Sequence, residues 1–305
     1  MTRVSIVLGA GGPVGHAFHA GVLRALEDAL GFDARTATLI VGTSAGAQVA
    51  ALLRAGMSAR DLGARVRGRK LTPEGRAIAQ HYVRPSHELP PRSQRPPWRP
   101  GSLRYLSSAI RRPWRARPGR LVSALMPDGP VSLEPQAAGF RALFGDRWPD
   151  EELWIPAVCR DTGERVAFGS GNAPSTDVGS AVAASGAVPG VCQSVLIAGR
   201  RFVDGGIASA AHVDLLAATD EDVIFVSNPL SLFPPLRLLL RREVRALRPA
   251  NKRVVLFEPS ADAAAVMGLD VMDVSRAGPT VEAAREAAMK SLRARKLRQL
   301  AEQLF

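Results

Sequence analysis

The chain has 305 residues, 46% of them hydrophobic and 5% aromatic, and its formal net charge is +12. This length is sufficient for a large hydrophobic core, and the composition excludes a protein that is disordered throughout. No apolar run reaches the roughly 20 residues of a membrane-spanning helix, and the apolar stretch at the N-terminus continues into glycines rather than a signal-peptide cleavage site. The sequence therefore predicts a cytoplasmic globular protein without a signal peptide or transmembrane helix.

The positive charge is concentrated in one segment. Residues 54–120 contain 17 basic and three acidic side chains, a net charge of +14, whereas residues 1–53 are balanced and residues 121–305 carry −2. Between residues 84 and 120, eight prolines lie among ten arginines, and proline interrupts both helices and strand pairing. We therefore expect residues 84–119 to lack regular structure, and residues 56–130 to form a basic, proline-rich insertion or cap.

Short apolar runs alternate with helical spacing along the rest of the chain, which is typical of an α/β fold. Strands are predicted at residues 4–8, 38–41, 154–160, 165–169, 193–197, 201–203, 222–227 and 254–258. Helices are predicted at residues 17–30, 47–53, part of 56–75, 177 to about 189, and 280–304. Two strand–turn–helix units within the first 55 residues indicate a mostly parallel sheet, and we expect one α/β domain spanning residues 1–305.

A serine between two glycines follows the second predicted strand. The segment Gly42-Thr43-Ser44-Ala45-Gly46 fits the pattern G-x-S-x-G. Small flanking residues let the backbone pass close to the serine on a tight strand-to-helix turn, which exposes the hydroxyl. The helix that follows directs its positive end at that oxygen and favours negative charge there. We interpret Ser44 as a catalytic nucleophile, because the alternative of an ordinary helix N-cap does not explain both glycines.

A second glycine-rich turn, residues 9–15, follows the first predicted strand. Such turns cradle pyrophosphate in dinucleotide-binding proteins, or present backbone amides to an oxyanion. A dinucleotide site would have an acidic residue closing the second strand, whereas here that strand leads into Ser44. We therefore expect the amides of this turn and Ser44 to form one site, and a dinucleotide-dependent enzyme is a more distant alternative.

A carboxylate at a predicted strand end completes the candidate chemistry. Asp204 is followed by Gly205 and Gly206, which allow the chain to turn sharply there. A serine hydrolase needs a proton acceptor, usually histidine, and the order Ser44, Asp204, His212 formally matches an α/β-hydrolase triad. A nucleophile at position 44 comes too early for that fold, so we interpret His212 as a residue at a helix entry.

The other candidate side chains are assigned structural roles. His16 and His19 lie beside the glycine turn, and we interpret them as packing residues, with pocket lining as the alternative. Cys159 and Cys192 form no C-x-x-C pair and no cluster with metal-ligand spacing. We therefore expect two reduced, buried thiols, no metal site and no cofactor.

Together these motifs resemble those of the patatin-like phospholipase family. Members of that family carry a glycine-rich oxyanion strip, G-x-S-x-G some 30 residues later and D-G-G or D-G-A further on, and residues 9–12, 42–46 and 204–206 match in that order. The run at 183–190, followed by 199–206, is also very similar to the family's approach to its aspartate. The resemblance covers residues 4–55 and 155–230, and implies a three-layer α/β/α fold with a mostly parallel central sheet.

The resemblance implies roles for individual residues. Ser44 would be the nucleophile and Asp204 the base of a Ser–Asp dyad. Gly11 and Gly12 would donate hydrogen bonds in the oxyanion hole, with Ala45 as a third donor. The family's motif glycines correspond to Gly9, Gly42, Gly46, Gly205 and Gly206.

Two positions depart from the family pattern. Val14 stands where the family often has arginine or lysine, which removes a fixed positive charge and puts a preference for phosphate headgroups in doubt. Pro13 follows the glycines and has no N–H to donate, which makes Gly11 and Gly12 the better donors.

The resemblance implies a lipid acyl hydrolase that cleaves carboxylic esters without a metal or cofactor. An alternative of another class is a lipid-binding or regulatory member of the fold with weak catalysis. For the basic residues 84–120, three interpretations stay open: a solvated loop, a patch that contacts an anionic membrane through arginines, Trp98 and Trp114, and a nucleic-acid-binding patch. The last is the weakest, because the sequence contains no nucleic-acid reader motif.

Overall fold

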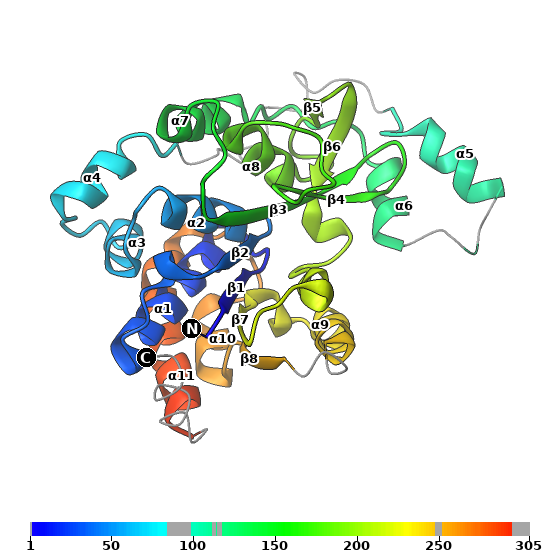
Figure 1. Ribbon diagram of the computed structural model, residues 1–305. Coiled ribbons are helices and arrows are strands. Elements are labelled where there is room, and N and C mark those ends of the chain that lie inside the picture. The colour runs from blue at the N-terminus through cyan, green and yellow to red at the C-terminus, as the bar shows by residue number, and fades with distance from the viewer. Residues whose placement is uncertain (1, 84–98, 112–113, 115–117, 248–251, 295–305) are drawn as a thin grey trace. The chain divides into compact units, whose positions relative to one another are not determined.

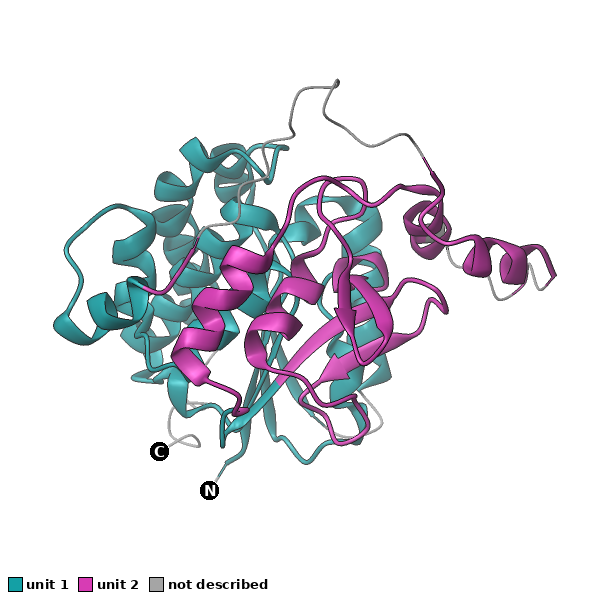
Figure 2. Ribbon diagram, turned by 90° about the horizontal axis from the view of Figure 1, so that it is seen from above, with its two compact units in different colours: residues 1–80, 149–153, 210–305 teal, residues 81–148, 154–209 magenta. Residues whose placement is uncertain are grey.

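The computed structural model describes residues 2–83, 99–111, 114, 118–247 and 252–294 (Figure 1). The chain forms two compact units, coloured separately in Figure 2. Unit 1 comprises residues 1–80, 149–153 and 210–305, and unit 2 comprises residues 81–148 and 154–209. Among the described residues, no helix is both long and apolar enough to cross a membrane.

Parallel strands form the centre of unit 1. In spatial order they are β2 (Leu39–Gly42), β1 (Val4–Leu8), β7 (Val223–Ser227) and β8 (Arg253–Phe257). Every residue of β1, β2 and β7 is buried. Continuous apolar runs of this kind are typical of parallel strands that are covered on both faces. The predicted α/β class with a mostly parallel central sheet is confirmed.

Helices cover these strands. Figure 1 shows α1, α3 and α11 on one side of the sheet of unit 1 and α9 on the other. The α-helices of unit 1 are α1 (Gly12–Leu30), α2 (Ala45–Arg54), α3 (Ala59–Val66), α4 (Pro73–Ala79), α9 (Pro234–Ala246), α10 (Ala261–Met267) and α11 (Ala277–Ala294). Its short 3₁₀ helices are η1 (Ala34–Thr36), η5 (Val213–Ala218), η6 (Pro229–Leu232) and η8 (Val274–Arg276).

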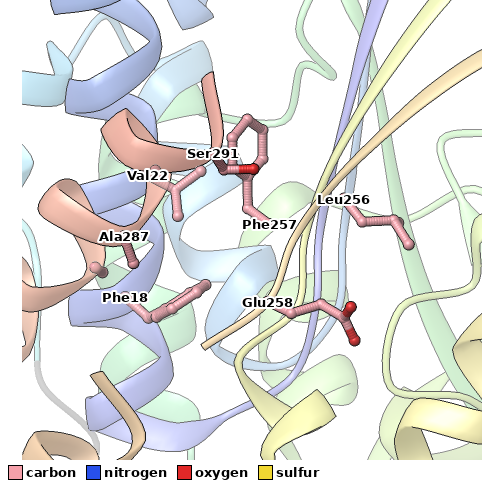
Figure 3. Close-up of a pocket in the computed structure, with 9 residues that line it drawn as sticks. Phe18, Val22, Leu256, Phe257, Glu258, Ala287 and Ser291 are labelled. Atoms are coloured by element: carbon pink, nitrogen blue, oxygen red, sulfur yellow. The ribbon is translucent and has the colours of Figure 1, made fainter. Parts of the chain in front are cut away.

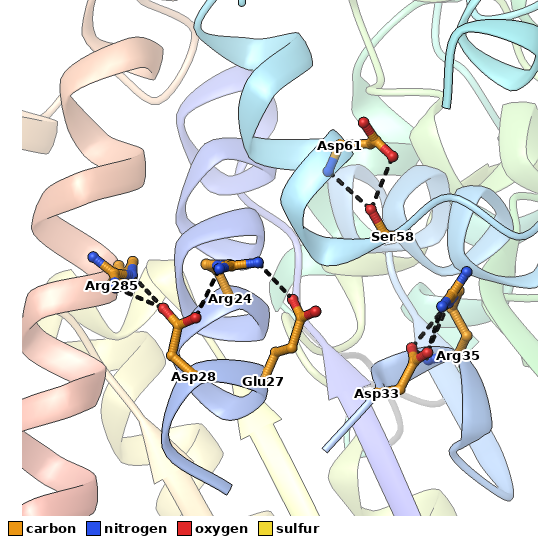
Figure 4. Close-up of polar contacts among 8 residues, drawn as sticks. All are labelled: Arg24, Glu27, Asp28, Asp33, Arg35, Ser58, Asp61 and Arg285. Atoms are coloured by element: carbon orange, nitrogen blue, oxygen red, sulfur yellow. Dashed lines mark hydrogen bonds and ion pairs between the residues drawn. The ribbon is translucent and has the colours of Figure 1, made fainter. Parts of the chain in front are cut away.

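Ion pairs join α1 to α11, which pack along each other (Figure 4). Arg285 Nη2 lies 2.6 Å from Asp28 Oδ2, and Arg24 Nη2 lies 2.9 Å from Asp28 Oδ1. Arg24 also pairs with Glu27, at 3.0 Å. The Asp28 side chain is only 17% exposed, so this short network is less screened by solvent than an isolated surface pair.

Unit 2 combines antiparallel strands with helices. The strand β3 (Glu152–Cys159) pairs with β4 (Arg165–Phe168) and β6 (Arg200–Asp204), and β6 pairs with β5 (Val195–Ile197). The helices are α5 (Leu103–Arg111), α6 (Pro118–Leu125), α7 (Glu134–Phe144), α8 (Val178–Gly186) and the 3₁₀ helix η4 (Gly205–Ile207). Each of the eight predicted strands is present, with small shifts at its ends.

The prediction that residues 84–119 lack regular structure is wrong at α5. Pro100 and Pro113 lie outside this helix, which contains no proline, so nothing interrupts its backbone hydrogen bonds. Ser102 precedes the helix, and its Oγ accepts a hydrogen bond from the Tyr105 amide at 3.1 Å, as an N-terminal cap does. Residues 84–98, where five of the eight prolines lie, are outside the described residues.

Helix boundaries account for most of the remaining differences. The first helix begins at Gly12 rather than residue 17, because Pro13 has the φ angle of a first helical turn and needs no amide acceptor there. The helices α6, α7, α9 and α10 were not predicted from the sequence, and α6 begins at Pro118, within the segment expected to lack regular structure. The closing helix is present from Ala277, and residues 295–304 of its predicted range lie outside the described residues.

Candidate active site

Ser44 adopts an unusual backbone conformation between β2 and α2. Its φ is 54° and its ψ is −114°, which lies outside the regions that L residues ordinarily occupy. Such a conformation costs of order 1–3 kcal/mol and persists where the surrounding structure imposes it, often at active sites. The residue is half-buried. The strained strand-to-helix turn predicted from G-x-S-x-G is therefore present.

The two motif glycines are required by close packing. A Cβ at Gly46 would lie 2.0 Å from the Leu8 carbonyl oxygen, and a Cβ at Gly42 would lie 2.5 Å from the Gly46 carbonyl oxygen. Both distances are far below van der Waals contact, so any side chain would displace backbone. Helix α2 thus begins directly against the ends of β1 and β2, and this packing forces the turn at Ser44.

The glycine turn and Ser44 leave the sheet of unit 1 at the same edge. Leu8, the last residue of β1, pairs in register with Gly42, the last residue of β2. The Thr43 amide donates to the Leu8 carbonyl at 2.9 Å. The structure therefore brings the loop at residues 9–12 next to Ser44, as the sequence predicts.

The amides of this loop divide into two groups. Within the described residues, the amides of Gly9, Ala10, Val14 and Gly15 donate to backbone carbonyls. In the same part of the chain, no hydrogen bond is found for the amides of Gly11, Gly12 and Ala45. Amides at a helix N-terminus have no intrahelical acceptor, and the helix dipole favours an anion there. The three amides predicted as donors therefore have no acceptor among the described residues, and their role in an oxyanion hole stays a prediction.

His19 is completely buried beneath the glycine turn. Its Nε2 lies 2.8 Å from the Gly9 carbonyl oxygen, and its Nδ1 lies 2.8 Å from Ser227 Oγ. A carbonyl only accepts, so Nε2 carries the proton and Nδ1 accepts from the Ser227 hydroxyl. Burial lowers the pKa of His19 from 6.5 to about 4, and the hydrogen bond to Gly9 opposes this shift. His19 is a neutral side chain that holds the first residue of the turn.

The lowered pKa of His19 predicts a loss of stability in acid. Above pH 6.5 the imidazole is neutral in both states, whereas between pH 6.5 and about 4 the unfolded chain binds a proton that the native state does not. Between pH 7.5 and pH 5, this difference is expected to lower the free energy of unfolding by about 2 kcal/mol. Urea titrations of wild type and His19→Gln at both pH values measure it, because the variant lacks the titrating group. An equal fall in the two proteins contradicts the prediction.

Asp204 ends β6 in unit 2 and is held by the backbone on both sides. Its amide donates to the Ala187 carbonyl at 3.0 Å, and its Oδ1 accepts from the Gly206 amide at 2.7 Å. The residue is 6% exposed. Burial raises the pKa of the nearby Cys192 thiol to about 11, and the Asp204 charge contributes to that rise. The predicted sharp turn at Asp204, Gly205 and Gly206 is present as the start of η4.

The predicted residues divide between the two units. Ser44, Ala45 and the glycines of residues 9–12 lie together in unit 1, whereas Asp204 and its two glycines lie in unit 2. His212 lies in unit 1 at the entry to η5, with φ 58° and ψ 34°, as interpreted from the sequence. The contacts of His19 with Gly9 and Ser227 were not predicted from the sequence. The available signal was its position one helical turn after Gly15, which places both residues on the same face of α1.

The structure also shows the surroundings of Val14, of the two cysteines and of the side chains that could bind a metal. Val14 is fully buried and its amide donates to the Val271 carbonyl at 3.2 Å, so this position supplies no charge. Cys159 and Cys192 are buried free thiols, as predicted. A search of the described residues finds no group of three or more His, Cys, Asp or Glu side chains that could hold a metal ion.

A small cavity of about 200 Å³ lies elsewhere in unit 1 (Figure 3). Phe18 and Val22 of α1, residues 256–258 at the end of β8, and small residues of α11 line it. None of the site residues predicted from the sequence contributes to its wall. The cavity therefore does not include the serine turn.

The scan against protein families agrees with the motifs. The family model described as "Patatin-like phospholipase" matches residues 6–217. No curated protein matches the sequence significantly. Among solved structures, the crystal structure of VipD from Legionella pneumophila matches with a TM-score of 0.43 and 14% sequence identity, over 96% of this chain and 67% of that chain. Because the family model spans more than half of the sequence, the chain belongs to the patatin-like phospholipase family.

Proposed function

We propose that this protein is a serine acyl hydrolase that cleaves carboxylic esters of lipids through Ser44 and Asp204. The observation that carries the proposal is the backbone of Ser44, at φ 54° and ψ −114°, beside the amides of Gly11, Gly12 and Ala45. A strained serine next to donors without protein acceptors is the arrangement that acyl transfer requires. Family membership supports the lipid class of the substrate.

In the proposed first step, Ser44 Oγ attacks the ester carbonyl carbon. The hydroxyl proton passes to the Asp204 carboxylate, the carbonyl oxygen becomes an oxyanion, and collapse of the intermediate expels the alcohol, which takes that proton. Water then attacks the acyl-enzyme, gives its proton to Asp204, and releases the fatty acid as Ser44 regains a proton. A carboxylate is a weak base in water, and the 6% exposure of Asp204 is consistent with the shielding that this role needs.

The amides of Gly11, Gly12 and Ala45 would stabilise the oxyanion. One preorganised donor of this kind lowers the barrier by about 3–4 kcal/mol. The N-terminus of α2 adds a positive partial charge at the same place. His19 would support the hole indirectly, because it fixes the Gly9 carbonyl two residues before Gly11.

The substrate is proposed by class, as a lipid or a smaller ester. The buried Val14 gives no cation that would bind a phosphate headgroup at the glycine turn. We also propose peripheral contact with anionic membrane through residues 84–120, of which residues 84–98, 112–113 and 115–117 lie outside the described residues.

Hydrolysis of a lipid panel by the wild-type protein tests the proposed function. The protein is incubated, with and without EDTA, with phosphatidylcholine, lysophosphatidylcholine, a triacylglycerol or a p-nitrophenyl ester. The released acid or phenol is measured. We expect turnover of at least one substrate, unaffected by EDTA. A protein that binds these lipids but releases no product is the lipid-binding alternative, and that result would contradict the proposal.

A further inference from the structure

The segment of unit 2 that contains α5 and α6 (Figure 1) includes several large apolar side chains that are exposed. Ile110 is 82% exposed, Trp114 77% and Leu103 70%. The other exposed apolar side chains of this pair are Val122, Leu125 and Met126. Large apolar side chains exposed in this number within one short segment point to an interaction site rather than ordinary surface.

The opposite face of α5 is anchored, which fixes the direction of these side chains. Tyr105 is buried against the turn between β3 and β4, so closely that a Cβ at Gly163 would lie 2.4 Å from its ring. Ser102 Oγ donates to Asp161 Oδ1 at 2.9 Å. Leu103 and Ile110 are seven residues apart, so they share one helix face, and Tyr105 lies on the other. The packing of Tyr105 against unit 2 therefore keeps Leu103 and Ile110 on the exposed face of α5.

Helix α6 is attached to the loop that follows Asp204. A Cβ at Gly119, the second residue of α6, would lie 2.4 Å from the carbonyl oxygen of Ile207 in η4. The Ser102 amide donates to the Ala124 carbonyl at 3.0 Å and ties α5 to the same helix. The pair thus packs against the segment that begins at the proposed catalytic base.

The segment that forms α5 and α6 carries charge of one sign, although the Asp161 carboxylate beside Ser102 lies within electrostatic range of Arg104. Residues 99–126 contain seven arginines and no acidic residue. Arg99, Arg104 and Arg111 are exposed, and the structure gives them no ion pair with another described residue. Each arginine near an anionic bilayer strengthens binding about fivefold, and tryptophan favours the boundary between headgroups and acyl chains. Exposed apolar side chains among cations of one sign complement an anionic lipid surface.

We propose that α5 and α6 form a docking surface for an anionic phospholipid bilayer, next to η4, the short helix that follows Asp204. The α5–α6 surface consists of the six exposed apolar side chains together with Arg99, Arg104 and Arg111. The apolar residues enter the interface and the arginines bind headgroup phosphates. Binding to the bilayer does not require the proposed function. The inference rests on that function only where it says that docking gives the enzyme access to lipid substrate.

Vesicle co-sedimentation of full-length Ser44→Ala protein tests this surface without hydrolysis. Vesicles of phosphatidylcholine alone are compared with vesicles containing 30% phosphatidylglycerol, each at low and high salt. We expect binding to the anionic vesicles that weakens with salt, and little binding to the neutral ones. The double variant Ile110→Ser, Trp114→Ser and the double variant Arg104→Gln, Arg111→Gln should each bind at least about tenfold more weakly. Equal binding to neutral and anionic vesicles overturns the proposal.

Leu269→Ser is the matched control, because Leu269 is 77% exposed but lies in unit 1. It should bind vesicles like the parent protein, and an equal loss in this control would overturn the assignment of the surface. The same surface substitutions are also made in the protein that keeps Ser44, where hydrolysis of a soluble ester should be unchanged. This second assay distinguishes a failure of docking from a failure of the proposed function. If sedimentation velocity shows a dimer that Ile110→Ser, Trp114→Ser converts to a monomer, the occupant is a second copy and the bilayer proposal is wrong.

Discussion

Substitution of Asp204 by asparagine, or of Ser44 by alanine, is expected to lower kcat/KM for ester hydrolysis by at least about 1,000-fold. Each change removes a group that acts in the same step, the transfer of the serine proton as the acyl bond forms. Because the two groups act as a unit, the double variant should be no less active than the single variants. Initial rates with a p-nitrophenyl ester measure all three proteins.

The asparagine substitution separates chemistry from folding. An asparagine side chain keeps an oxygen that can accept from the Gly206 amide, as Asp204 Oδ1 does at 2.7 Å, so the turn into η4 should be preserved. The melting temperature is therefore expected to stay close to that of wild type. An Asp204→Asn protein that is folded and retains more than about a tenth of the activity contradicts the dyad.

Substitution of Gly46 by alanine is expected to destabilise the fold by more than about 4 kcal/mol or to prevent folding. The added Cβ would lie 2.0 Å from the Leu8 carbonyl oxygen, which is held in the sheet of unit 1. Relief would require α2 to move away from β1 and β2, which breaks the core at its most buried strands. Urea denaturation, or the soluble yield of the variant, measures the effect.

Gly278→Ala is the matched control for Gly46→Ala. Both glycines are the second residue of a helix, but a Cβ at Gly278 would have no atom within 4 Å. The alanine should change the free energy of unfolding by no more than about 1 kcal/mol, because the helix preference of alanine is opposed by the restriction that Pro279 places on the residue before it. Equal stabilities of the two variants would contradict the steric reason given for the serine turn.

The strands and the serine turn could be predicted from the sequence because their signals are local. A buried parallel strand is a short apolar run, and G-x-S-x-G contains both glycines that the packing of α2 requires. The helix α5 was missed because prolines on either side of residues 103–111 made the whole segment resemble a loop. Helix α9 begins with two prolines, which are tolerated in a first turn but suggest an interruption in a sequence.

Contacts between distant residues could not be predicted in the same way. The position of His19 was visible, but its bond to Ser227 joins residues 208 positions apart, and nothing in either local pattern names the partner. The same holds for the anchoring of α6 on Ile207, which depends on a close approach of two backbones. The sequence could name Gly11, Gly12 and Ala45 as donors, but only the structure shows which neighbouring amides are already used.

Reaction with a fluorophosphonate probe, followed by mass spectrometry of the digested protein, tests the central claim most directly. Such probes form a stable adduct only with an activated serine hydroxyl. One adduct per chain is predicted, on the peptide that contains Ser44, with no labelling of Ser44→Ala and much slower labelling of Asp204→Asn. A folded wild-type protein that is not labelled, or is labelled at another serine, would contradict the assignment of Ser44 as the nucleophile.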